Sequence, residues 1–455
     1  MASTYLTKTF SSAPTNAKKG TFSVWFKLSG NDDNSNNAYY RIIATGADSV
    51  NRSDINITNP SYDGAGTLNF TYYNTASQED SLTTEVKFKD VSAYYHLVVA
   101  WDTTQSTASN RVKIYLNGNQ ITNFSTENYP EQNDDLHFGN NSTVHHIGSS
   151  PHFATRFFQG IMSHFHYCDG YTYQASDFGS TDATTGEWKI NTAPSVTYGN
   201  NGFWLFKDNA SANDQSGNSN NFTVSGGTLT PTIDNPSNNF AVLDSNLNNN
   251  TVLVYTHGNT TMTTSGQWIG TTATLPMYKG KYYWEFKCTG NFLLGISQLN
   301  TEAVQTDYLN TANTGYSSRS TYGYEIINGG SKSTASSSSA YGPSYSNGDI
   351  GMVAFDADNG TLWFGKNGTW SNSATETEIE NGTTTNAAYT GLTSGNGHIP
   401  TMSVENSTLY FNFGNGYFGT TAVSSAGNNA SNLGTFEYDV PAGFTALCTK
   451  GINSF

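Results

Sequence analysis

Charged side chains are scarce in this chain: 12% of its 455 residues are Asp, Glu, Lys or Arg, which is about half the share of an average globular protein. The 20 basic residues are outnumbered by 35 acidic ones, giving a formal net charge of -15, and no part of the sequence gathers lysines or arginines. A protein that binds nucleic acid needs a basic stripe to neutralise phosphates. The sequence therefore predicts no nucleic-acid partner.

Long apolar runs and cysteines are scarce as well. No run approaches the roughly 20 apolar residues of a membrane-spanning helix, and residues 1–20 lack the apolar centre of a signal peptide. We therefore expect no membrane insertion, and assembly in a cytosol. Cys168, Cys288 and Cys448 are odd in number and far apart, which favours buried reduced thiols over disulfides or a zinc site.

Aromatic residues, by contrast, reach 14% and recur in short alternating runs with β-branched residues. This pattern is typical of strands and argues against disorder. Helical periodicity is almost absent, apart from a short turn expected near 175–178. Runs that predict an antiparallel sandwich over the first part of the chain lie at 21–28, 68–72, 95–101, 112–116 and 161–167.

A hairpin is predicted between Asn347 and Trp370, with the sequence NGDIGMVAFDADNGTLWFGKNGTW. Two apolar strands are joined by an Asp-Asn-Gly turn and closed by Asn367-Gly368. Asn-Gly pairs accept the positive φ angles of two-residue hairpin turns. The run RVKIYLNG at 111–118 ends in the same way. We expect the hairpin to supply these core residues: Ile350, Val353, Phe355, Leu362 and Phe364.

The predicted domain organisation has three parts, as a chain of this length usually forms two or three domains. Residues 1–200 form one β-rich domain and residues 276–455 a second, with a C-terminal tail. Residues 201–275 are expected to connect them, because 208–221 and 237–250 are rich in Asn and Ser and have few apolar anchors.

The first domain resembles a laminin-G-like, or concanavalin A-like, jelly roll. FSVWFKLS at 22–29 resembles its early strand, and YHLVVAWD at 95–102 resembles its W-H-x-V-x-V strand. RVKIYLNG matches the strand and turn that follow, and QGIMSHFHYCD at 159–169 lies where that family has its closing strand. The resemblance covers most of residues 1–190 and implies an antiparallel jelly roll.

The second domain resembles a SPRY domain, which is also a concanavalin A-like sandwich. KYYWEFKC at 281–288, LLGIS at 293–297, the hairpin described above and TLYFNFG at 408–414 occur in the family's order. Together the two resemblances imply an all-β fold, with two concanavalin A-like antiparallel β-sandwiches (jelly rolls) in series.

The pairing of these domains, with an Asn-rich join and the tail VPAGFTALCT at 440–449, looks like virion proteins of tailed bacteriophages. This resemblance implies a non-enzymatic structural protein of the virion, assembled in the host cytoplasm: a fibre, appendage or capsid decoration. Its lectin-like domains would adhere to a glycan or protein of the host surface. Other virion proteins are the implied partners, and a homo-oligomer such as a trimer is the implied state. A polysaccharide depolymerase attached to the virion, or a capsid-stabilising protein without external ligand, are the alternatives.

Catalysis is not predicted, although the jelly-roll superfamily includes glucanases. A retaining enzyme of that kind needs two carboxylates about 5 Å apart, commonly from an E-x-D-x-x-E strand, and the sequence has none. Glu376, Glu378 and Glu380 alternate in ETEIE, but they lie in a Thr- and Asn-rich stretch that we expect to be a solvated edge or loop. No catalytic residue is assigned.

Two sets of residues are candidate metal ligands. His164 and His166 are expected to share a strand face, and at a three-fold axis such a strand would offer imidazoles to a transition metal; surface or interface histidines are the favoured alternative. Asp208, Asn213 and Asp214 lie in the oxygen-rich stretch DNASANDQSGN, where Ca²⁺ is the candidate ion. Laminin-G relatives often bind calcium, but Asn-rich linkers commonly look like this without binding anything. No other cofactor is expected.

A glycan-binding surface is predicted around Tyr316, Tyr322, Tyr341 and Tyr345, with Asn347 nearby. Lectins usually stack an exposed aromatic ring on the C–H face of a sugar, and the partner surface of SPRY domains is formed by loops between strands. With 28 tyrosines in the chain, burial of these rings on the sandwich is the competing interpretation.

Overall fold

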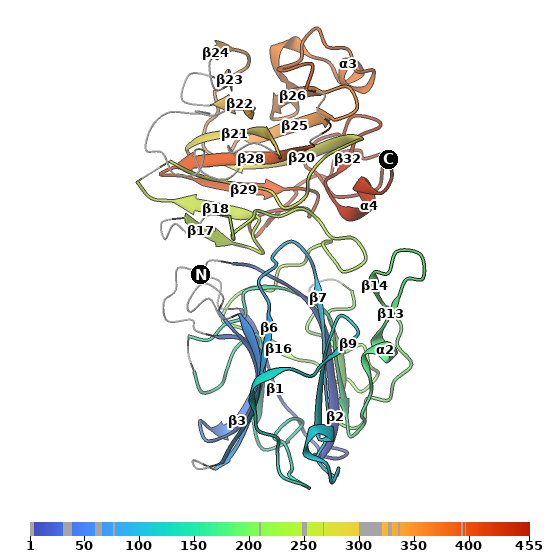
Figure 1. Ribbon diagram of the computed structural model, residues 1–455. Coiled ribbons are helices and arrows are strands. Elements are labelled where there is room, and N and C mark those ends of the chain that lie inside the picture. The colour runs from blue at the N-terminus through green and yellow to red at the C-terminus, as the bar shows by residue number, and fades with distance from the viewer. Residues whose placement is uncertain are drawn as a thin grey trace. The chain divides into compact units, whose positions relative to one another are not determined.

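The computed structural model describes residues 4–30, 39–59, 66–75, 78–153, 155–208, 211–247, 253–266, 268–299, 321–325, 330–334, 337–392, 395 and 397–455. Strands make up 46% and helices 5%, so the all-β prediction is confirmed. The chain forms two compact units: the first takes in most of residues 1–231, and the second takes in residues 232–455 together with Ser29 and Gly30. Each unit contains two large sheets, which are antiparallel apart from one short parallel pairing (Figure 1).

One sheet of the first unit has eight strands in the order β10-β6-β5-β4-β3-β11-β1-β16. They are β1 (Tyr5–Thr9), β3 (Tyr39–Asp48), β4 (Asn51–Thr58), β5 (Thr67–Thr75), β6 (Gln78–Lys87), β10 (Phe124–Glu127), β11 (Val144–Ile147) and β16 (Thr223–Ser225). The other sheet has six strands in the order β15-β12-β2-β7-β8-β9. They are β2 (Lys19–Leu28), β7 (Tyr95–Asp102), β8 (Val112–Leu116), β9 (Asn119–Ile121), β12 (Gly160–Asp169) and β15 (Phe203–Leu205).

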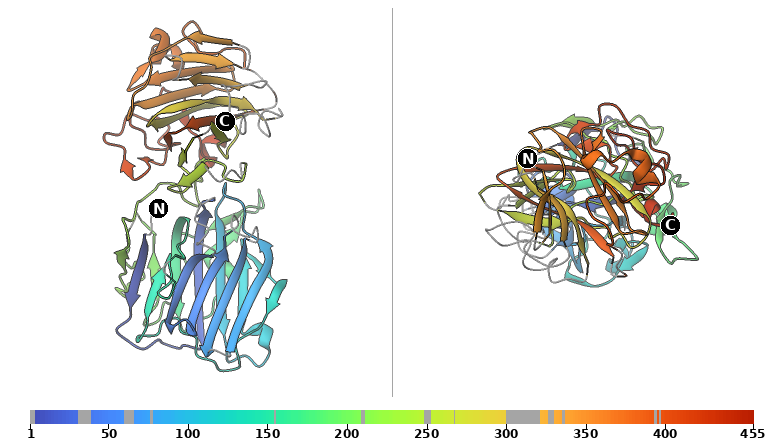
Figure 2. Two further views of the ribbon diagram at one scale, coloured as in Figure 1. Left: turned by 90° about the vertical axis from the view of Figure 1, so that its left-hand side faces the viewer. Right: turned by 90° about the horizontal axis from the view of Figure 1, so that it is seen from above.

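The core of the first unit lies between these two sheets, which Figure 1 shows edge-on as two facing layers; the left view of Figure 2 looks onto the face of the eight-stranded sheet. Val24 and Phe26 of β2 and Val99 and Trp101 of β7 point into it and are at most 1% exposed. Burying one such side chain contributes about 1.5–3 kcal/mol. Because side chains alternate along a strand, the residues between them point to the outer face of the sheet.

The second unit repeats this plan with a different strand order. Its larger sheet runs β17-β18-β29-β20-β25-β26-β27, with β32 paired to β20, and its six-stranded sheet runs β19-β28-β21-β22-β23-β24. The larger sheet contains β17 (Leu253–Thr256), β18 (Thr261–Thr264), β20 (Lys281–Cys288), β25 (Ile350–Asp356), β26 (Thr361–Lys366), β27 (Thr369–Trp370), β29 (Thr408–Asn412) and β32 (Thr445–Ala446). The smaller contains β19 (Ile269–Thr272), β21 (Asn291–Gln298), β22 (Thr321–Glu325), β23 (Ser331–Thr334), β24 (Ser337–Ala340) and β28 (His398–Glu405).

The predicted hairpin is confirmed as β25 and β26. The Asn-Gly pair that follows β26 and the one that follows β8 both form turns. Asn367 and Gly368 have φ angles of 47° and 81°, and Asn117 and Gly118 have 47° and 84°. Asn367 also bonds Ile350 of β25 twice: its backbone N–H donates to the carbonyl, and its side-chain oxygen accepts from the N–H, both at 2.8 Å. The asparagine thereby extends the strand pairing by one residue.

The core positions predicted in the hairpin are nearly all correct. Val353, Phe355, Leu362 and Phe364 belong to the core of the second unit and are at most 1% exposed. They pair across the two strands, with Val353 opposite Phe364 and Phe355 opposite Leu362. Ile350, at the start of β25, is half-buried. The alternation that predicted a buried face therefore holds along the hairpin.

Helices are short. Those in the described residues are α2 (Ala175–Phe178), α3 (Glu376–Glu380), α4 (Thr449–Ile452) and the 3-10 turns η1 (Ala108–Asn110) and η3 (Ser371–Ser373). None of the helices described is long and apolar enough to cross a membrane. The expectation that ETEIE forms an edge or loop was wrong: Thr375 and Glu378 bond each other's backbone N–H, and such a capping box starts a helix.

The segment 201–275, expected as a connecting region, contributes strands to the sheets of both units. β15 pairs with β12, β16 with β1, β18 with β29 and β19 with β28. Apolar residues within the polar stretches explain the difference: Phe203 and Leu205 are fully buried in the first core, and Leu253 in the second. These strands have three or four residues each, too few to show a period in the sequence. Two further two-stranded sheets pair β13 (Gly179–Thr181) with β14 (Trp188–Ile190), and β30 (Tyr417–Phe418) with β31 (Thr421–Ala422).

The cysteines follow the prediction. Cys168, Cys288 and Cys448 are all buried and unpaired. Burial raises the pKa of Cys288 to about 11, so this side chain is a neutral thiol at physiological pH.

Candidate functional site

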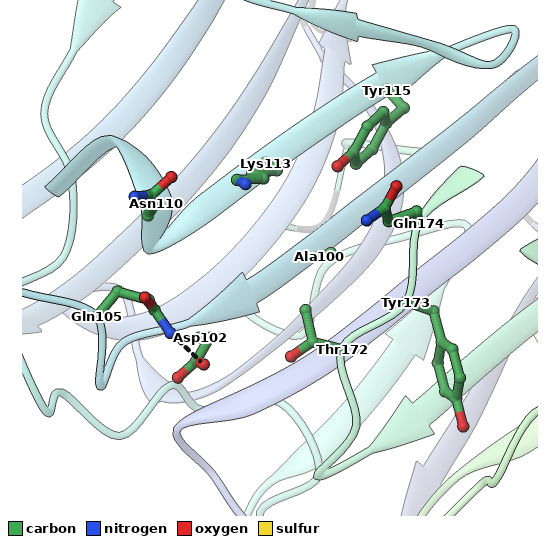
Figure 3. Close-up of a pocket in the computed structure, with 9 residues that line it drawn as sticks. All are labelled: Ala100, Asp102, Gln105, Asn110, Lys113, Tyr115, Thr172, Tyr173 and Gln174. Atoms are coloured by element: carbon green, nitrogen blue, oxygen red, sulfur yellow. Dashed lines mark hydrogen bonds between the residues drawn. The ribbon is translucent and has the colours of Figure 1, made fainter. Parts of the chain in front are cut away.

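A pocket of about 320 Å³ opens on the outer face of the six-stranded sheet of the first unit. Strands β7 and β8 form its floor, and the segment that follows β12 forms one wall (Figure 3). The lining consists of Ala100, Asp102, Gln105, Asn110, Lys113, Tyr115, Thr172, Tyr173 and Gln174.

The two-residue period of the strands explains this floor. Ala100 and Asp102 alternate along β7 with core residues, and Lys113 of β8 lies opposite Ala100 in the pairing. Tyr115 follows Lys113 on the same face. The residues that fill the core therefore alternate with those that line the pocket, and one strand pair serves both.

Asp102 is held in a fixed conformation at one end of the pocket. Its Oδ1 accepts hydrogen bonds from the backbone N–H and the hydroxyl of Thr104, at 3.1 and 2.5 Å, and its Oδ2 accepts one from the side-chain amide of Gln105 at 2.8 Å. The Lys19 ammonium lies 3.1 Å from Oδ2. Burial by itself would raise the pKa of Asp102, but these interactions lower it below its ordinary value. The carboxylate is therefore charged at neutral pH.

Three other groups of the lining are free to bind a ligand. Within the described part of the chain, no hydrogen bond engages the side chains of Asn110, Lys113 or Tyr115. Tyr115 is 8% exposed, and burial raises the pKa of its hydroxyl, which therefore stays protonated and able to donate. The pocket thus offers an amide, an ammonium and a phenol hydroxyl.

The chemistry of the lining is suited to binding rather than to hydrolysis. Amides and hydroxyls both donate and accept hydrogen bonds, as sugar hydroxyls do, and phenol rings offer apolar surface beside a polar tip. Asp102 is the one carboxylate of the lining. A glycosidase needs a second, about 5 Å away for retention or about 6.5–9.5 Å for inversion.

The chain that continues beyond the pocket wall into β14 is anchored to the sheet through His96, a residue that the sequence did not mark. Its Nε2 lies 2.9 Å from the hydroxyl of Ser23, and its Nδ1 accepts a hydrogen bond from the indole N–H of Trp188, also at 2.9 Å. The imidazole stacks on Trp25, with ring centroids 4.6 Å apart, and its plane is nearly parallel to that of Trp188, whose centroid lies 5.9 Å away. Burial lowers the pKa of His96 to about 3, so the ring is neutral and Nε2 carries the proton.

His164 and His166 lie near this anchor on β12. Their ring centroids are 6.4 Å apart, but a β-bulge interrupts the strand between Ser163 and His166. His166 is 2% exposed, with its Nδ1 2.9 Å from the Tyr198 hydroxyl, and the Nδ1 of His164 lies 2.8 Å from the Ser163 hydroxyl. His166 is thus an interior group rather than a surface ligand. In the described ranges, no group of three or more His, Cys, Asp or Glu side chains could hold a metal ion.

The oxygen atoms of Asp214 are taken up by its own loop. They accept four hydrogen bonds, from the backbone N–H groups of Trp204, Ser216 and Asn220 and from the hydroxyl of Ser216, all at 2.8–2.9 Å. Asp208 and Asn213 are exposed. The carboxylate that was a calcium candidate therefore organises a loop, as Asp commonly does in turns.

Tyr341 and Tyr345 lie in the core of the second unit rather than on its loops. Each is 7% exposed, and their hydroxyls donate to the carbonyls of Asn386 and Gly365 at 3.0 and 2.7 Å. Neither ring has a free face for a sugar, so the prediction was wrong for these two residues. Their hydroxyls reach main-chain acceptors while their rings fill the sandwich, which is how tyrosine is commonly buried.

The other residues of that predicted surface do not assemble into a site. Tyr322 packs edge-on against Tyr389, with centroids 5.4 Å apart, and its exposure is intermediate. Asn347 is exposed in the turn before β25. Tyr316 lies outside the described residues.

Comparison with known families agrees with both halves of this description. Residues 2–175, which include the whole pocket, match a laminin-G model of the concanavalin A-like lectin/glucanases superfamily. Residues 281–416 match the SPRY domain. The chain therefore carries a laminin-G-like, concanavalin A-like domain followed by a SPRY domain. Domains of these two classes typically bind or interact rather than catalyse.

Solved structures with local similarity are SPRY domains and a toxin. The TRIM65 PSpry domain is 12% identical over 38% of this chain and 88% of its own, with a TM-score of 0.29. The SPRY domain of human HERC1 is 14% identical over 35% and 91%, with a TM-score of 0.26. Stonustoxin is 14% identical over 38% of this chain and 27% of its own, with a TM-score of 0.29. No curated protein matches the sequence significantly.

Proposed function

We propose that this protein is a non-enzymatic saccharide-binding protein that uses the pocket of the first unit, and that it serves as a structural protein of a tailed-phage virion. It is displayed as a fibre, appendage or capsid decoration and adheres to a glycan of the host surface. The observation that carries the binding assignment is the set of unengaged polar side chains in the pocket: Asn110, Lys113 and Tyr115.

The shape of the pocket and its fixed groups support a small ligand. A volume of about 320 Å³ lies at the low end of ligand sites, which span about 300–1,000 Å³, and accommodates one or two sugar rings. The bonds from Thr104 and Gln105 orient the Asp102 carboxylate before any ligand arrives, which reduces the ordering cost of binding. The Asp102 carboxylate accepts hydrogen bonds from sugar hydroxyls, while Asn110 and Lys113 donate.

The virion assignment rests on the resemblance of the paired domains and of the tail at 440–449 to phage structural proteins. The low share of charged residues supports it, since an amide- and hydroxyl-rich surface is soluble without strong electrostatic attraction to nucleic acid or membranes. Antibody labelling of purified particles tests this placement. Label on the capsid, tail or fibres supports the virion assignment, and absence of the protein from purified virions would contradict it.

Binding is tested separately, with the purified full-length chain on an array of neutral and acidic bacterial-surface oligosaccharides. Hits are measured again with Tyr115→Phe and Asn110→Ala, and with Asn128→Ala as a matched control, because Asn128 is exposed and lies after β10 of the other sheet. We expect both pocket variants to weaken binding about tenfold, as lost ligand hydrogen bonds do, and the control to bind normally. Release of reducing ends from the same saccharides would instead favour a depolymerase.

A further inference from the structure

Three of the five arginines of this acidic chain converge at one place. Arg41, Arg52 and Arg156 all lie around the ring of Phe153, with their guanidinium carbons 5.6, 5.3 and 3.7 Å from its centroid. Arg41 belongs to β3 and Arg52 to β4, and Phe153 and Arg156 belong to the segment between β11 and β12. This arginine cluster lies on the outer face of the eight-stranded sheet, remote in the fold from the saccharide pocket on the other sheet.

A single carboxylate lies within the cluster. Asp54 of β4 accepts a hydrogen bond from Nη1 of Arg41 on one oxygen, and lies 3.0 Å from Nε of Arg52 with the other. The Asp54 side chain is 1% exposed and the Arg41 side chain 3%. Within the described residues, no salt bridge engages Arg156. The cluster thus holds more positive than negative charge.

Other acidic groups nearby are committed elsewhere. Asp48, the last residue of β3, accepts hydrogen bonds from the backbone N–H of Val50 and the side-chain amide of Asn51 at 2.8–3.0 Å. Glu79 of β6 bonds the hydroxyl of Tyr73. Neither engages Arg156.

The Asp54 carboxylate is fixed by a chain of hydrogen bonds that crosses three strands. The hydroxyl of Thr83 donates to the side-chain oxygen of Asn69 at 2.7 Å, the amide of Asn69 donates to Asn56 at 3.3 Å, and the amide of Asn56 donates to Asp54 at 2.7 Å. Every donor points toward Asp54, so this carboxylate cannot turn to meet a third arginine. The chain builds a rigid base for Arg41 and Arg52.

Two buried nitrogen atoms at the cluster have no hydrogen-bond partner in the described structure: Nε of Arg41 and Nε2 of His152. A buried polar atom without a partner is costly, and such atoms are few in native structures. Arg156, which shares the Phe153 ring with Arg41, is half-buried. The Arg41 Nε–H is an unpaired donor, and such a donor beside excess positive charge is what an anion-binding site needs.

We infer that Arg156, in the positive field of Arg41 and Arg52, binds the anionic group of an acidic saccharide, a carboxylate or a sulfate; Arg52 itself is held by Asp54 and by the Ser49 carbonyl. The planar fork of a guanidinium donates two parallel hydrogen bonds to such a group, and stacking on aromatic rings holds the fork in place. Arg156 stacks on Phe153 and on Tyr39, at 3.7 and 4.7 Å. The inference rests on the proposed saccharide function and adds to it a second subsite, which selects charged saccharides and is separate from the pocket.

The test compares neutral, carboxylated and sulfated forms of one oligosaccharide by isothermal titration calorimetry, with inorganic sulfate as a further titrant. The variants are Arg156→Gln, Arg156→Lys and the control Lys87→Gln, which removes an exposed charge from the same sheet. We expect the charged forms to bind about tenfold more tightly than the neutral form. Arg156→Gln should abolish this preference, Arg156→Lys should restore part of it, and Lys87→Gln should leave it unchanged.

A purely structural role for Arg156 would lower the melting temperature of Arg156→Gln and leave the preference for charged saccharides intact, which would overturn the inference. Equal binding of inorganic sulfate and of the acidic saccharide would overturn the saccharide assignment. Binding of the neutral form that depends on Tyr115, without any charge preference, would leave the proposed function standing while the arginine site fails. Failure of all forms to bind would remove the proposed function itself.

Discussion

The indole N–H of Trp188 donates a hydrogen bond to Nδ1 of His96 at 2.9 Å, and the planes of the two rings are 18° apart. Trp188 belongs to β14, after the segment that walls the pocket, and His96 belongs to the strand β7 that floors it. This pair ties β14 to the strand that floors the pocket, across 92 residues of sequence. It positions the site without contacting its lining.

Trp188→Phe keeps most of the packing and removes the donor. The buried Nδ1 of His96 then lacks a partner, which costs about 1–3 kcal/mol of unfolding free energy. Saccharide binding should weaken together with stability because the wall loosens. Chemical denaturation measures the first effect and calorimetry the second. Trp268→Phe is the matched control, since Trp268 is also partly buried and makes no hydrogen bond in the described structure; an equal loss in both variants would contradict the anchor role.

His96 also makes stability depend on pH. Burial lowers its pKa to about 3 from an ordinary 6.5, so the unfolded chain binds a proton below pH 6.5 while the folded chain does not. Stability is therefore complete above pH 6.5 and is lost as the pH falls toward 3, by about 1.4 kcal/mol for each pH unit and each such histidine. Other histidines of the first unit shift in the same direction: His145, His146 and His164.

Denaturation of wild type and of His96→Gln at pH 7, 5.5 and 4.5 measures this contribution. We expect the variant to lose less free energy between pH 7 and 4.5 than the wild type loses. Identical slopes would show that His96 titrates normally in the folded protein.

Glu285 of the second unit shifts stability in the opposite direction. It is fully buried, and its Oε1 and Oε2 accept hydrogen bonds from the backbone N–H groups of Tyr438 and Glu437, which attach the C-terminal tail to β20. Burial raises its pKa to about 7 from 4.5. The folded chain thus holds a proton that the unfolded chain has released, and stability falls by up to about 3 kcal/mol as the pH rises from 4.5 to 7.

Glu285→Gln removes the titrating group and should remove this part of the slope. The unfolding free energies of wild type and variant are measured from pH 4.5 to 7.5 by denaturation followed by tryptophan fluorescence. Their difference separates the contribution of Glu285 from that of the histidines of the same unit. A difference that does not change with pH would contradict the raised pKa of Glu285.

Two substitutions in the turn after β26 distinguish the cost of backbone strain from the cost of a lost hydrogen bond. Asn367→Gly keeps the positive φ of 47° accessible but removes the acceptor for the Ile350 N–H, and should cost about 1 kcal/mol. Asn367→Ala adds the strain of the left-handed conformation, about 1–2 kcal/mol more. Thermal melts of the two variants should therefore rank Gly above Ala, and the reverse order would contradict the turn geometry.

Chelation tests the loop of Asp214. Because its carboxylate oxygens are engaged by Trp204, Ser216 and Asn220, EDTA should leave the melting temperature unchanged, whereas Asp214→Ala should lower the unfolding free energy by about 1–3 kcal/mol. A drop in melting temperature on chelation that Ca²⁺ reverses would show that the loop binds calcium.

The sequence predicted what depends on local chemistry. Asn117-Gly118 and Asn367-Gly368 turn where they were expected to, since few residues other than Asn and Gly accept their φ angles readily. Val353 and Phe355 are buried as the two-residue period requires. The same period also places Asp102, Lys113 and Tyr115 on the outer face of β7 and β8, where they alternate with the apolar residues.

The sequence could not show which distant segments meet. Nothing near Trp188 indicates that its indole bonds His96, because the contact depends on how the segment after β12 folds back over the sheet. Tyr345 resembles an exposed loop residue in a Ser- and Gly-rich stretch, yet its hydroxyl reaches the Gly365 carbonyl and its ring the core. The arginine cluster is equally hidden, since Arg41 and Arg156 are far apart in sequence and share one phenylalanine.

Saccharide binding at the Tyr115 pocket is tested most directly by titrating the best array ligand into wild type and Tyr115→Phe, each checked for an unchanged fold by circular dichroism. The phenol ring stays in place in the variant and the hydroxyl alone is lost, so the prediction is about a tenfold rise in Kd with an unchanged melting temperature. Equal affinity of the two proteins would contradict the assignment of this pocket as the binding site.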